Sequence, residues 1–319
     1  VVEGRELHHI VSGRIIRADK ELLRWFTPGQ IETIAQAAED HRASSDRKPR
    51  DIYGMIIAEA DRDIDPVKII KRTVGYGMSH YPELSRQEQW ERTLAHLNDK
   101  YAEDGYLKLW IPESGNAARL AELRSIMKDG ERLRDIFDRE YQRLRVLRFL
   151  ESNGIPYEIH EHPPLFTIEE ALEWWKDISN CTHCKNLFMR NHKGDRHYLI
   201  SFECHKQMDI HSLEHALHQG KLSFASPERM MRCLGLKPGS VSPLGLIEDK
   251  DLAGADPKEL FENGHRVKLY LDPELLQSAR ISFHPCDNTA SVVLARDDFF
   301  RFLGLWGGEY EFLTHRKAE

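Results

Sequence analysis

The strongest constraint on the fold is a change of pattern at residues 153–156, whose sequence is Asn-Gly-Ile-Pro. Before this point, apolar residues recur with the 3.6-residue period of amphipathic helices, for example over residues 30–41 and 52–60. After it, short β-like runs separated by turns alternate with helical stretches. Gly readily ends a helix, and the residue before Pro is usually extended. The chain is therefore predicted to be multidomain, with an all-α domain over residues 1–140 and an α/β domain over residues 141–319.

The individual elements follow from the same signals. Pro66 comes directly after Asp65 and can open a helix at its first turn. A long charged helix is predicted over residues 117–151, with a break in two at Gly130 and the domain junction near Tyr141. In the second domain the predicted strands are residues 197–202, 266–271, 281–283 and 290–295, and the predicted helices are residues 168–177, 210–218, 227–234 and 297–303.

Composition argues against several classes of protein. The chain has a formal net charge of -7, whereas a protein that coats nucleic acid non-specifically is normally basic. We therefore expect no DNA partner, and RNA contact only over a local, salt-sensitive surface. No apolar run approaches the roughly 18 residues that cross a bilayer, so no membrane partner is expected. Five Cys, an odd number, favour free thiols in a cytoplasmic protein over a disulfide framework.

Three local signals lie in the second domain. Lys185 stands beside Asn186 before an apolar run, which places a cation and an amide near the end of a sheet, where they suit a phosphate or a ribose. Residues 235–245 contain three Gly and two Pro, and such a loop can offer backbone N–H groups to a carbonyl. His284 precedes Pro285 in a polar segment between apolar strands. Each signal has a plainer alternative, which is a solvated Lys at a strand start for Lys185, a connecting loop for residues 235–245 and a surface turn for His284.

Taken together, these signals carry a resemblance. The segments that carry it, in chain order, are Gly-Ile-Pro-Tyr at residues 154–157, His-Pro-Pro at 162–164, Lys-Asn-Leu-Phe at 185–188, Leu-Ser-Phe-Ala at 222–225, Gly-Ser-Val-Ser-Pro-Leu-Gly at 239–245, Phe-His-Pro at 283–285 and Asn-Thr-Ala at 288–290. Over about residues 141–316 the chain resembles the YbaK/prolyl-tRNA-synthetase-associated editing family, and within it the free-standing PrdX (ProXp-ala) proteins.

The resemblance implies a mixed-sheet α/β domain that deacylates mischarged tRNA, typically alanyl-tRNA(Pro). The implied partners are aminoacyl-tRNA and prolyl-tRNA synthetase, and no cofactor is implied for the editing domain. The site residues that it implies are catalytic Lys185, Asn186 and His284, with Gly239, Ser240, Pro243, Gly245, Asp287 and Asn288 for substrate binding.

A mechanism follows as a hypothesis. An aminoacyl ester is already activated, so the site needs position and charge stabilisation more than a strong nucleophile. Lys185 would hold the terminal adenosine and stabilise negative charge. The backbone amides of Gly239 and Ser240 would face the aminoacyl group, while Asn186 and His284 orient substrate or water. A small pocket would admit alanine and exclude proline by size. A domain that binds without hydrolysis is an alternative, and the presence of Lys185 argues against it.

The thiols suggest two further interpretations, both disfavoured. Cys181 and Cys184 form a single Cys-x-x-Cys, which His183 and the Cys204 beside His205 could complete as a zinc site. One such pair without a second is a weak zinc signal. A Cys nucleophile is also disfavoured, because the resembled family hydrolyses its ester without one.

In the first domain, His and carboxylate residues recur on predicted helices, a donor set that suits a divalent metal, although helix-end His and a capping Asp are the alternative. The pattern resembles the HD-domain phosphohydrolases, and residues 76–112 look like the corresponding stretch in one bacterial subgroup of that family. The implied ligands are His9, His41 and Asp61, with His8 less favoured. The family's defining His-Asp pair is absent and would lie upstream of Val1, so a truncated HD-like domain with weakened metal binding is expected. Metal-dependent phosphohydrolysis is the alternative main activity, with the second domain as an aminoacyl-tRNA-binding module.

Overall fold

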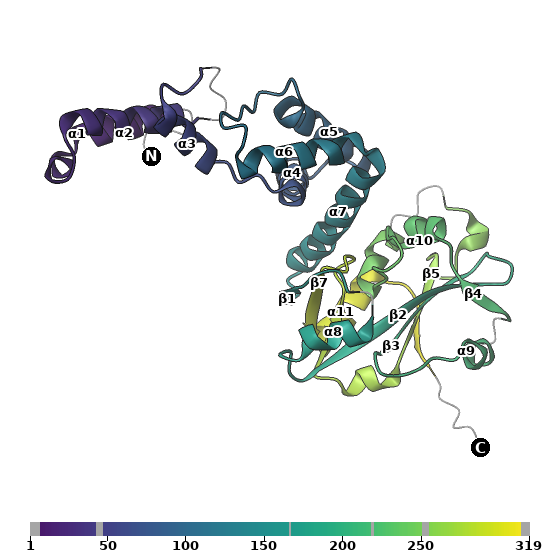
Figure 1. The fold of residues 1–319 in the computed structure, drawn as a ribbon. Helices are drawn as coiled ribbons and strands as arrows, with labels where there is room; N and C mark the ends of the chain where they lie inside the picture. The colour runs from purple at the N-terminus through teal and green to yellow at the C-terminus, as the bar shows by residue number, and fades with distance from the viewer. Residues whose placement is uncertain (1–6, 43–46, 166, 218–219, 251–254, 314–319) are drawn as a thin grey trace. The chain divides into compact units, whose positions relative to one another are not determined.

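The computed structural model describes residues 7–42, 47–165, 167–217, 220–250 and 255–313. The chain divides into two compact units, Val1–Asp138 and Arg139–Glu319 (Figure 1). No described helix is long and apolar enough to cross a membrane.

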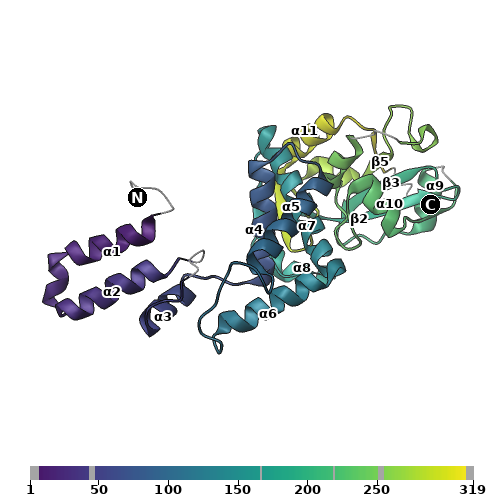
Figure 2. The same ribbon diagram turned by 90° about the horizontal axis from the view of Figure 1, so that it is seen from above.

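The first unit is helical, as the sequence predicted. α1 and α2 lie side by side and α3 follows them (Figure 2). α4, α5 and α6 share a core that includes Ile70, Leu97 and Leu123. The predicted long helix is two helices, because Asp129 ends one and its Oδ1 accepts from the backbone N–H of Arg132 in the next. The elements are α1 (His8–Ala18), η1 (Lys20–Arg24), α2 (Pro28–Asp40), α3 (Ile52–Ala60), α4 (Pro66–His80), α5 (Arg86–Tyr101), α6 (Gly115–Lys128) and α7 (Gly130–Ser152), which continues into the second unit.

The second unit is built on a mixed eight-stranded sheet, as predicted. Its strand order is β1-β7-β6-β2-β3-β5-β8, and β4 pairs with β2. The β2–β6, β3–β5 and β5–β8 pairs are parallel and the others are antiparallel. The strands are β1 (Glu158–Glu161), β2 (Cys181–Asn191), β3 (His197–Glu203), β4 (Leu222–Phe224), β5 (Val267–Leu271), β6 (Arg280–Phe283), β7 (Ala290–Ala295) and β8 (Tyr310–Phe312).

Both faces of the central strands are covered. Leu199 of β3 belongs to a large cluster with residues of α7, α10 and α11, whereas its neighbours Tyr198 and Ile200 belong to a second cluster with α9. Burial on both faces explains why β3 is a near-continuous apolar run. The remaining elements are α8 (Ile168–Trp175), α9 (Ile210–Leu217), α10 (Pro227–Leu234), α11 (Arg296–Trp306) and the 3₁₀ helices η2 (Pro243–Lys250), η3 (Pro257–Glu259) and η4 (Pro273–Gln277).

The sheet forks along β2, and this fork positions the site. Residues 181–183 of β2 pair with β6, and residues 189–191 pair with β4. Between these stretches, this edge of β2 is paired with neither β6 nor β4. The register pairs His183 with Ser282, so its continuation would bring Lys185 level with His284. Two side chains that are far apart in the sequence are thus carried to the same opening.

Candidate active site

A cavity of about 330 Å³ lies at the fork of the sheet. Its walls come from α8 and the segment before it, the middle of β2, the turn before η2 and the residue after β6. Lys185, the turn near residue 240 and His284 therefore share one hollow, as the hypothesis requires. The lining residues are Leu165, Thr167, Ile168, Ala171, Trp175, Cys184, Lys185, Asn186, Leu187, Gly239, Val241 and His284.

Lys185 is a partly buried cation with no hydrogen bond or ion pair among the described residues. It lies within β2, whereas the sequence predicted a position before an apolar run, near the end of a sheet. Apolar side chains such as Ile168 and Leu187 share the cavity wall with it. Charge interactions are stronger where water is partly excluded, so an unpaired ammonium group here suits a negatively charged ligand.

Asn186 is already engaged by the protein. Its Oδ1 accepts a hydrogen bond from Ser201 Oγ at 2.7 Å, and its Nδ2 donates to the carbonyl oxygen of Val241 at 3.1 Å. The amide therefore ties β3, β2 and the glycine-rich turn together. One N–H of the side chain remains, so its main role in this geometry is to position the turn.

The turn over residues 237–240 has Pro at its second position and Gly at its third. Gly239 has a φ of 90°, in the left-handed region, and the backbone N–H of Ser240 donates to the carbonyl of Lys237 at 3.3 Å. This is the pattern of a type II turn, which needs Gly at the third position. The Ser240 amide is used inside the turn, so the expectation that it faces the aminoacyl group needs correction. Among the described residues the Gly239 amide has no acceptor, and Gly239 lines the cavity, so this amide can take that role.

Five residues that the sequence assigned to substrate binding do not line the cavity. Ser240, Pro243 and Gly245 are buried, the last two within η2. Asp287 accepts from Thr289 Oγ1 at 2.6 Å, and Asn288 Oδ1 accepts from Arg139 Nη1 at 3.4 Å. In this geometry they support the turn and the segment after β6, and a ligand in the cavity would not touch them directly.

One ring nitrogen of His284 is hydrogen-bonded to the backbone, and the other has no hydrogen-bond partner among the described residues. Nδ1 contacts the carbonyl oxygen of Ala290 at 2.9 Å, and since a carbonyl only accepts, this nitrogen carries the proton. Burial lowers the pKa of His284, so the ring is held neutral. Nε2 then offers a lone pair and has no hydrogen-bond partner among the described residues. A neutral imidazole in this state can accept a proton from water.

The thiols near the cavity are not suited to nucleophilic attack. Burial raises the pKa of Cys184, which lines the cavity, and of Cys286 well above the ordinary value for a thiol. Since the thiolate is the nucleophile, neither is activated. Cys181 and Cys184 also point to opposite faces of β2, because they are three residues apart in a strand. The Cys-x-x-Cys pair therefore cannot hold one zinc ion.

The cavity wall that α8 provides was not among the predicted site residues. Thr167 caps this helix and forms a reciprocal capping box with Glu170, while Ala171 and Trp175 face inward. The capping box before an apolar helix face was a readable signal. It predicts a helix with one buried side, although it does not say what that side covers.

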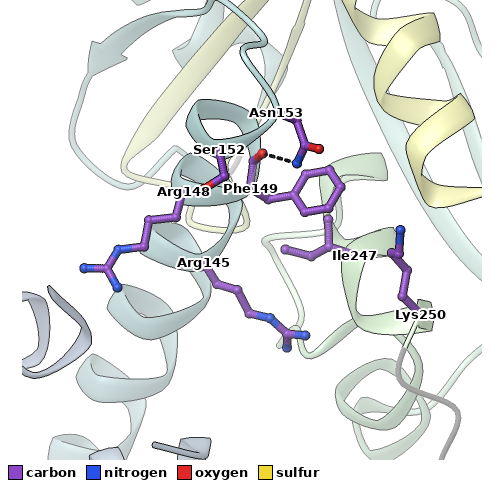
Figure 3. A pocket seen from close by; sticks show the side chains of 7 residues that line it. All are labelled: Arg145, Arg148, Phe149, Ser152, Asn153, Ile247 and Lys250. Carbon is purple, nitrogen blue, oxygen red and sulfur yellow. Dashed lines mark hydrogen bonds between the residues drawn. The ribbon is translucent and has the colours of Figure 1, made fainter. Parts of the chain in front are cut away.

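A second hollow of about 430 Å³ lies in the same unit, between α7 and η2. Figure 3 shows the apolar Phe149 and Ile247 between the cationic side chains of Arg148 and Lys250. Arg145 also lines it and pairs with Glu248. η2 begins just after the turn that lines the first cavity and ends at Lys250, so one short helix joins the two hollows.

In the first unit, the implied metal ligands are only partly gathered. His8 Nε2 lies 2.9 Å from His41 Nε2, whereas the ring centroids of His9 and His41 are 6.4 Å apart. Asp61 follows the last residue of α3. Among the described residues, His9, His41 and Asp61 are not a group whose donor atoms lie within 4.8 Å of one another. The HD-like assignment stays a prediction from the sequence.

Comparison with known proteins identifies the family of the second unit. The profile of the family described as the aminoacyl-tRNA editing domain matches residues 162–302. The chain is 32% identical over 167 residues to the prolyl-tRNA editing protein ProX of Acetoanaerobium sticklandii, which covers 52% of this chain and 93% of that protein. It is 29% identical over 157 residues to the prolyl-tRNA synthetase associated domain-containing protein 1 of Mus musculus, over 48% of this chain and 85% of that protein. About half of the chain has no counterpart in these relatives.

Proposed function

The chain belongs to the aminoacyl-tRNA editing domain family, and from this premise we propose that it is a free-standing deacylase that hydrolyses alanyl-tRNA(Pro). The observation that carries the proposal is the cavity shared by Lys185, Gly239 and His284. It combines an unpaired cation, a backbone donor and a neutral base around one small space.

These three groups have distinct roles in the proposed reaction. Water attacks the ester carbonyl of the aminoacyl group, and Nε2 of His284 accepts its proton. The Lys185 ammonium and the Gly239 amide stabilise the oxyanion that forms. The ester C–O bond then breaks, His284 Nε2 passes its proton to the leaving ribose oxygen, and the free amino acid departs. Stabilisation of the oxyanion by placed donors is usually the largest contribution to such a step.

The choice of alanine over proline rests on the size of the cavity, whereas the choice of tRNA(Pro) rests on the name of the prolyl-tRNA editing protein that this chain is similar to. The wall formed by Ile168, Ala171 and Trp175 is apolar, so it discriminates by volume and not by hydrogen bonds. A size filter of this kind separates substrates by roughly 10–200-fold per methylene. Prolyl-tRNA synthetase is the proposed partner that supplies the mischarged tRNA, and the cytoplasm is the proposed location.

The test is a deacylation assay over Ala-, Cys-, Ser- and Pro-tRNA with the full chain. We expect Ala-tRNA(Pro) to be hydrolysed fastest and Lys185→Ala to lower kcat/KM about 100-fold, the usual cost of one oxyanion donor. Lys193→Ala, an exposed lysine in the turn after β2, is the matched control and should keep wild-type activity. If the Lys185→Ala variant deacylates within a few-fold of the wild-type rate, Lys185 does not stabilise the oxyanion.

As a second candidate we propose a metal-dependent phosphohydrolase activity in the first unit, with the editing domain as its aminoacyl-tRNA-binding module. The observation that favours it is the cluster of imidazoles, in which the His8 and His9 rings are 5.7 Å apart and the His8 and His41 rings 4.9 Å apart. Metal analysis of the chain, with His41→Ala as the control, tests it. Equal and negligible metal in both proteins would exclude this candidate.

A further inference from the structure

Three donor groups of different chemistry meet where β3 ends. Cys204 Sγ lies 3.3 Å from Glu203 Oε1 and 3.4 Å from His205 Nδ1, and that nitrogen lies 2.6 Å from Glu203 Oε1. The described residues contain no other group of three His, Cys, Asp or Glu donors this close together. Cys204 is buried and the His205 side chain is 65% exposed, so the cluster reaches from the protein interior to solvent.

The spacing fits a tetrahedral zinc ion. Zinc binds sulfur at about 2.3 Å and nitrogen or oxygen at about 2.0–2.2 Å, which places neighbouring donors roughly 3.3–3.6 Å apart. The two distances from Cys204 Sγ already fall in or near this range. The distance between His205 and Glu203 is that of a hydrogen bond, and it widens by under 1 Å when the ion replaces the shared proton.

A second observation points to the same place. The backbone N–H of Cys204 donates to the carbonyl of His183 at 2.9 Å, which makes the two residues direct partners across the β2–β3 ladder. Side chains of such partners lie on the same face of the sheet. His183 is 9% exposed, and its Nδ1 is buried without a hydrogen-bond partner in the part of the chain that the structure describes. A buried imidazole nitrogen without a partner is costly and suits a ligand.

We propose that Glu203, Cys204 and His205 bind one zinc ion, with the neighbouring His183 as the candidate for the fourth position. Binding releases the thiol proton of Cys204 to solvent, and the ion bonds to the resulting thiolate. The proton that His205 Nδ1 shares with Glu203 passes through solvent to Nε2 of the same ring, which leaves the Nδ1 lone pair for the ion. This proposal departs from the sequence prediction of no cofactor for the editing domain, although the editing reaction does not use the ion. It also replaces the Cys-x-x-Cys interpretation, whose two thiols diverge.

The proposed ion lies close to the editing cavity. His183 stacks on Trp175, with ring centroids 4.2 Å apart and planes 3° apart, and Trp175 lines the cavity. Lys185 is two residues further along β2, on the same face as His183. The ion would therefore connect the start of β2 to the end of β3, beside the cavity wall.

The experiment uses the untagged full chain, freed of metal and titrated with Co²⁺ as a spectroscopic substitute for Zn²⁺. We expect one equivalent to bind with the visible absorption of a tetrahedral site and a thiolate-to-cobalt charge-transfer band, and Zn²⁺ should remove both. The band reports on this site alone relative to the imidazoles of the first unit, because all five Cys lie in the second unit. Cys204→Ser should abolish the charge-transfer band, and His205→Ala should weaken binding at least 10-fold, in line with removal of a ligand. Circular dichroism checks that each variant is folded.

The matched controls are His211→Ala and Cys233→Ser. His211 is an exposed histidine that pairs with Glu214 and does not belong to the donor cluster, and Cys233 is a buried thiol of the large core cluster. Both should bind Co²⁺ as the wild type does. A charge-transfer band that survives in folded Cys204→Ser, or the absence of tetrahedral binding in the wild type, would overturn the proposal whether or not the chain deacylates tRNA.

Discussion

At the scale of single residues, the cavity side chains differ in how many of their hydrogen bonds the protein already uses. Lys185 uses none among the described residues, His284 uses one ring nitrogen, and Asn186 uses both ends of its amide. A group that the protein has left unbonded can bind substrate, whereas a group that is bonded at both ends holds its neighbours in place. This distinction separates the proposed catalytic groups from a positioning residue.

The role of Asn186 can be tested with Asn186→Asp, which keeps the size of the side chain. A carboxylate oxygen would replace the Nδ2 donor and face the Val241 carbonyl, which now lies 3.1 Å away. We expect the free energy of unfolding to fall by about 1–3 kcal/mol, the cost of a broken partly buried hydrogen bond, and kcat to fall as the turn shifts. Urea unfolding and the deacylation rate measure the two effects.

The control for this prediction is Asn263→Asp. Its side chain is exposed, and its one hydrogen bond among the described residues is accepted from the backbone N–H of His265 at 3.2 Å. Asp can therefore replace it. If both variants match the wild type in stability and rate, Asn186 does not hold the turn.

At the scale of elements, β2 and β3 organise the second unit. β2 changes partner along its length, which opens the cavity, and β3 is buried on both faces. Burial of β3 includes its first residue, His197, which stacks on Phe188 and accepts a hydrogen bond at Nε2 from Arg229 Nη1 at 3.0 Å. A guanidinium only donates, so this imidazole must be neutral.

His197 makes the stability of the sheet depend on pH. Burial first, and then the charge of Arg229, lower its pKa from 6.5 to about 4. Between these two pKa values the unfolded chain binds the proton and the folded chain does not. The contribution of neutral His197 to the free energy of unfolding is therefore complete above pH 6.5 and is lost as the pH falls toward 4. The loss amounts to about 3 kcal/mol at 1.4 kcal/mol per pKa unit.

His197→Gln keeps an acceptor for Arg229 and does not titrate. We expect its free energy of unfolding, measured in urea at several pH values, to fall less than that of the wild type on acidification. His211→Gln, at an exposed position, should follow the wild-type curve. Parallel curves for His197→Gln and the wild type would contradict a neutral His197.

At the scale of the whole molecule, the charge of the chain limits how it can bind RNA. A net charge of -7 repels a polyanion, so cations must be concentrated where contact occurs. The hollow lined by Arg148 and Lys250 is such a concentration, and η2 connects it to the turn of the editing cavity (Figure 3). We infer that the acceptor end of the tRNA reaches this hollow.

Charge reversal there should weaken binding without affecting chemistry. For Arg148→Glu combined with Lys250→Glu, we expect KM for aminoacyl-tRNA to rise at least 10-fold with kcat nearly unchanged. The slope of log KM against log salt should fall by about 1–2, one per lost phosphate contact. Lys221→Glu, an exposed position outside the hollow, is the control. An unchanged salt slope would place the tRNA elsewhere.

Several features of this protein follow from short stretches of sequence. The helical first unit, the mixed α/β second unit and the Pro238-Gly239 turn are all encoded by residues that are neighbours in the chain. Helix periods, caps and turns depend on interactions within a few positions, so their patterns can be read directly. The resemblance that identified Lys185 and His284 also consists of short segments in a set order.

Tertiary structure decided which polar atoms are free. Asn186 is bonded to Ser201 and Val241, which lie 15 and 55 residues away, and Cys204 meets His183 only because β3 folds back on β2. The opposite directions of Cys181 and Cys184 likewise appear only once β2 is known to be a strand. Spacing along the chain determines local backbone shape, whereas the availability of a side chain depends on partners brought in from distant segments.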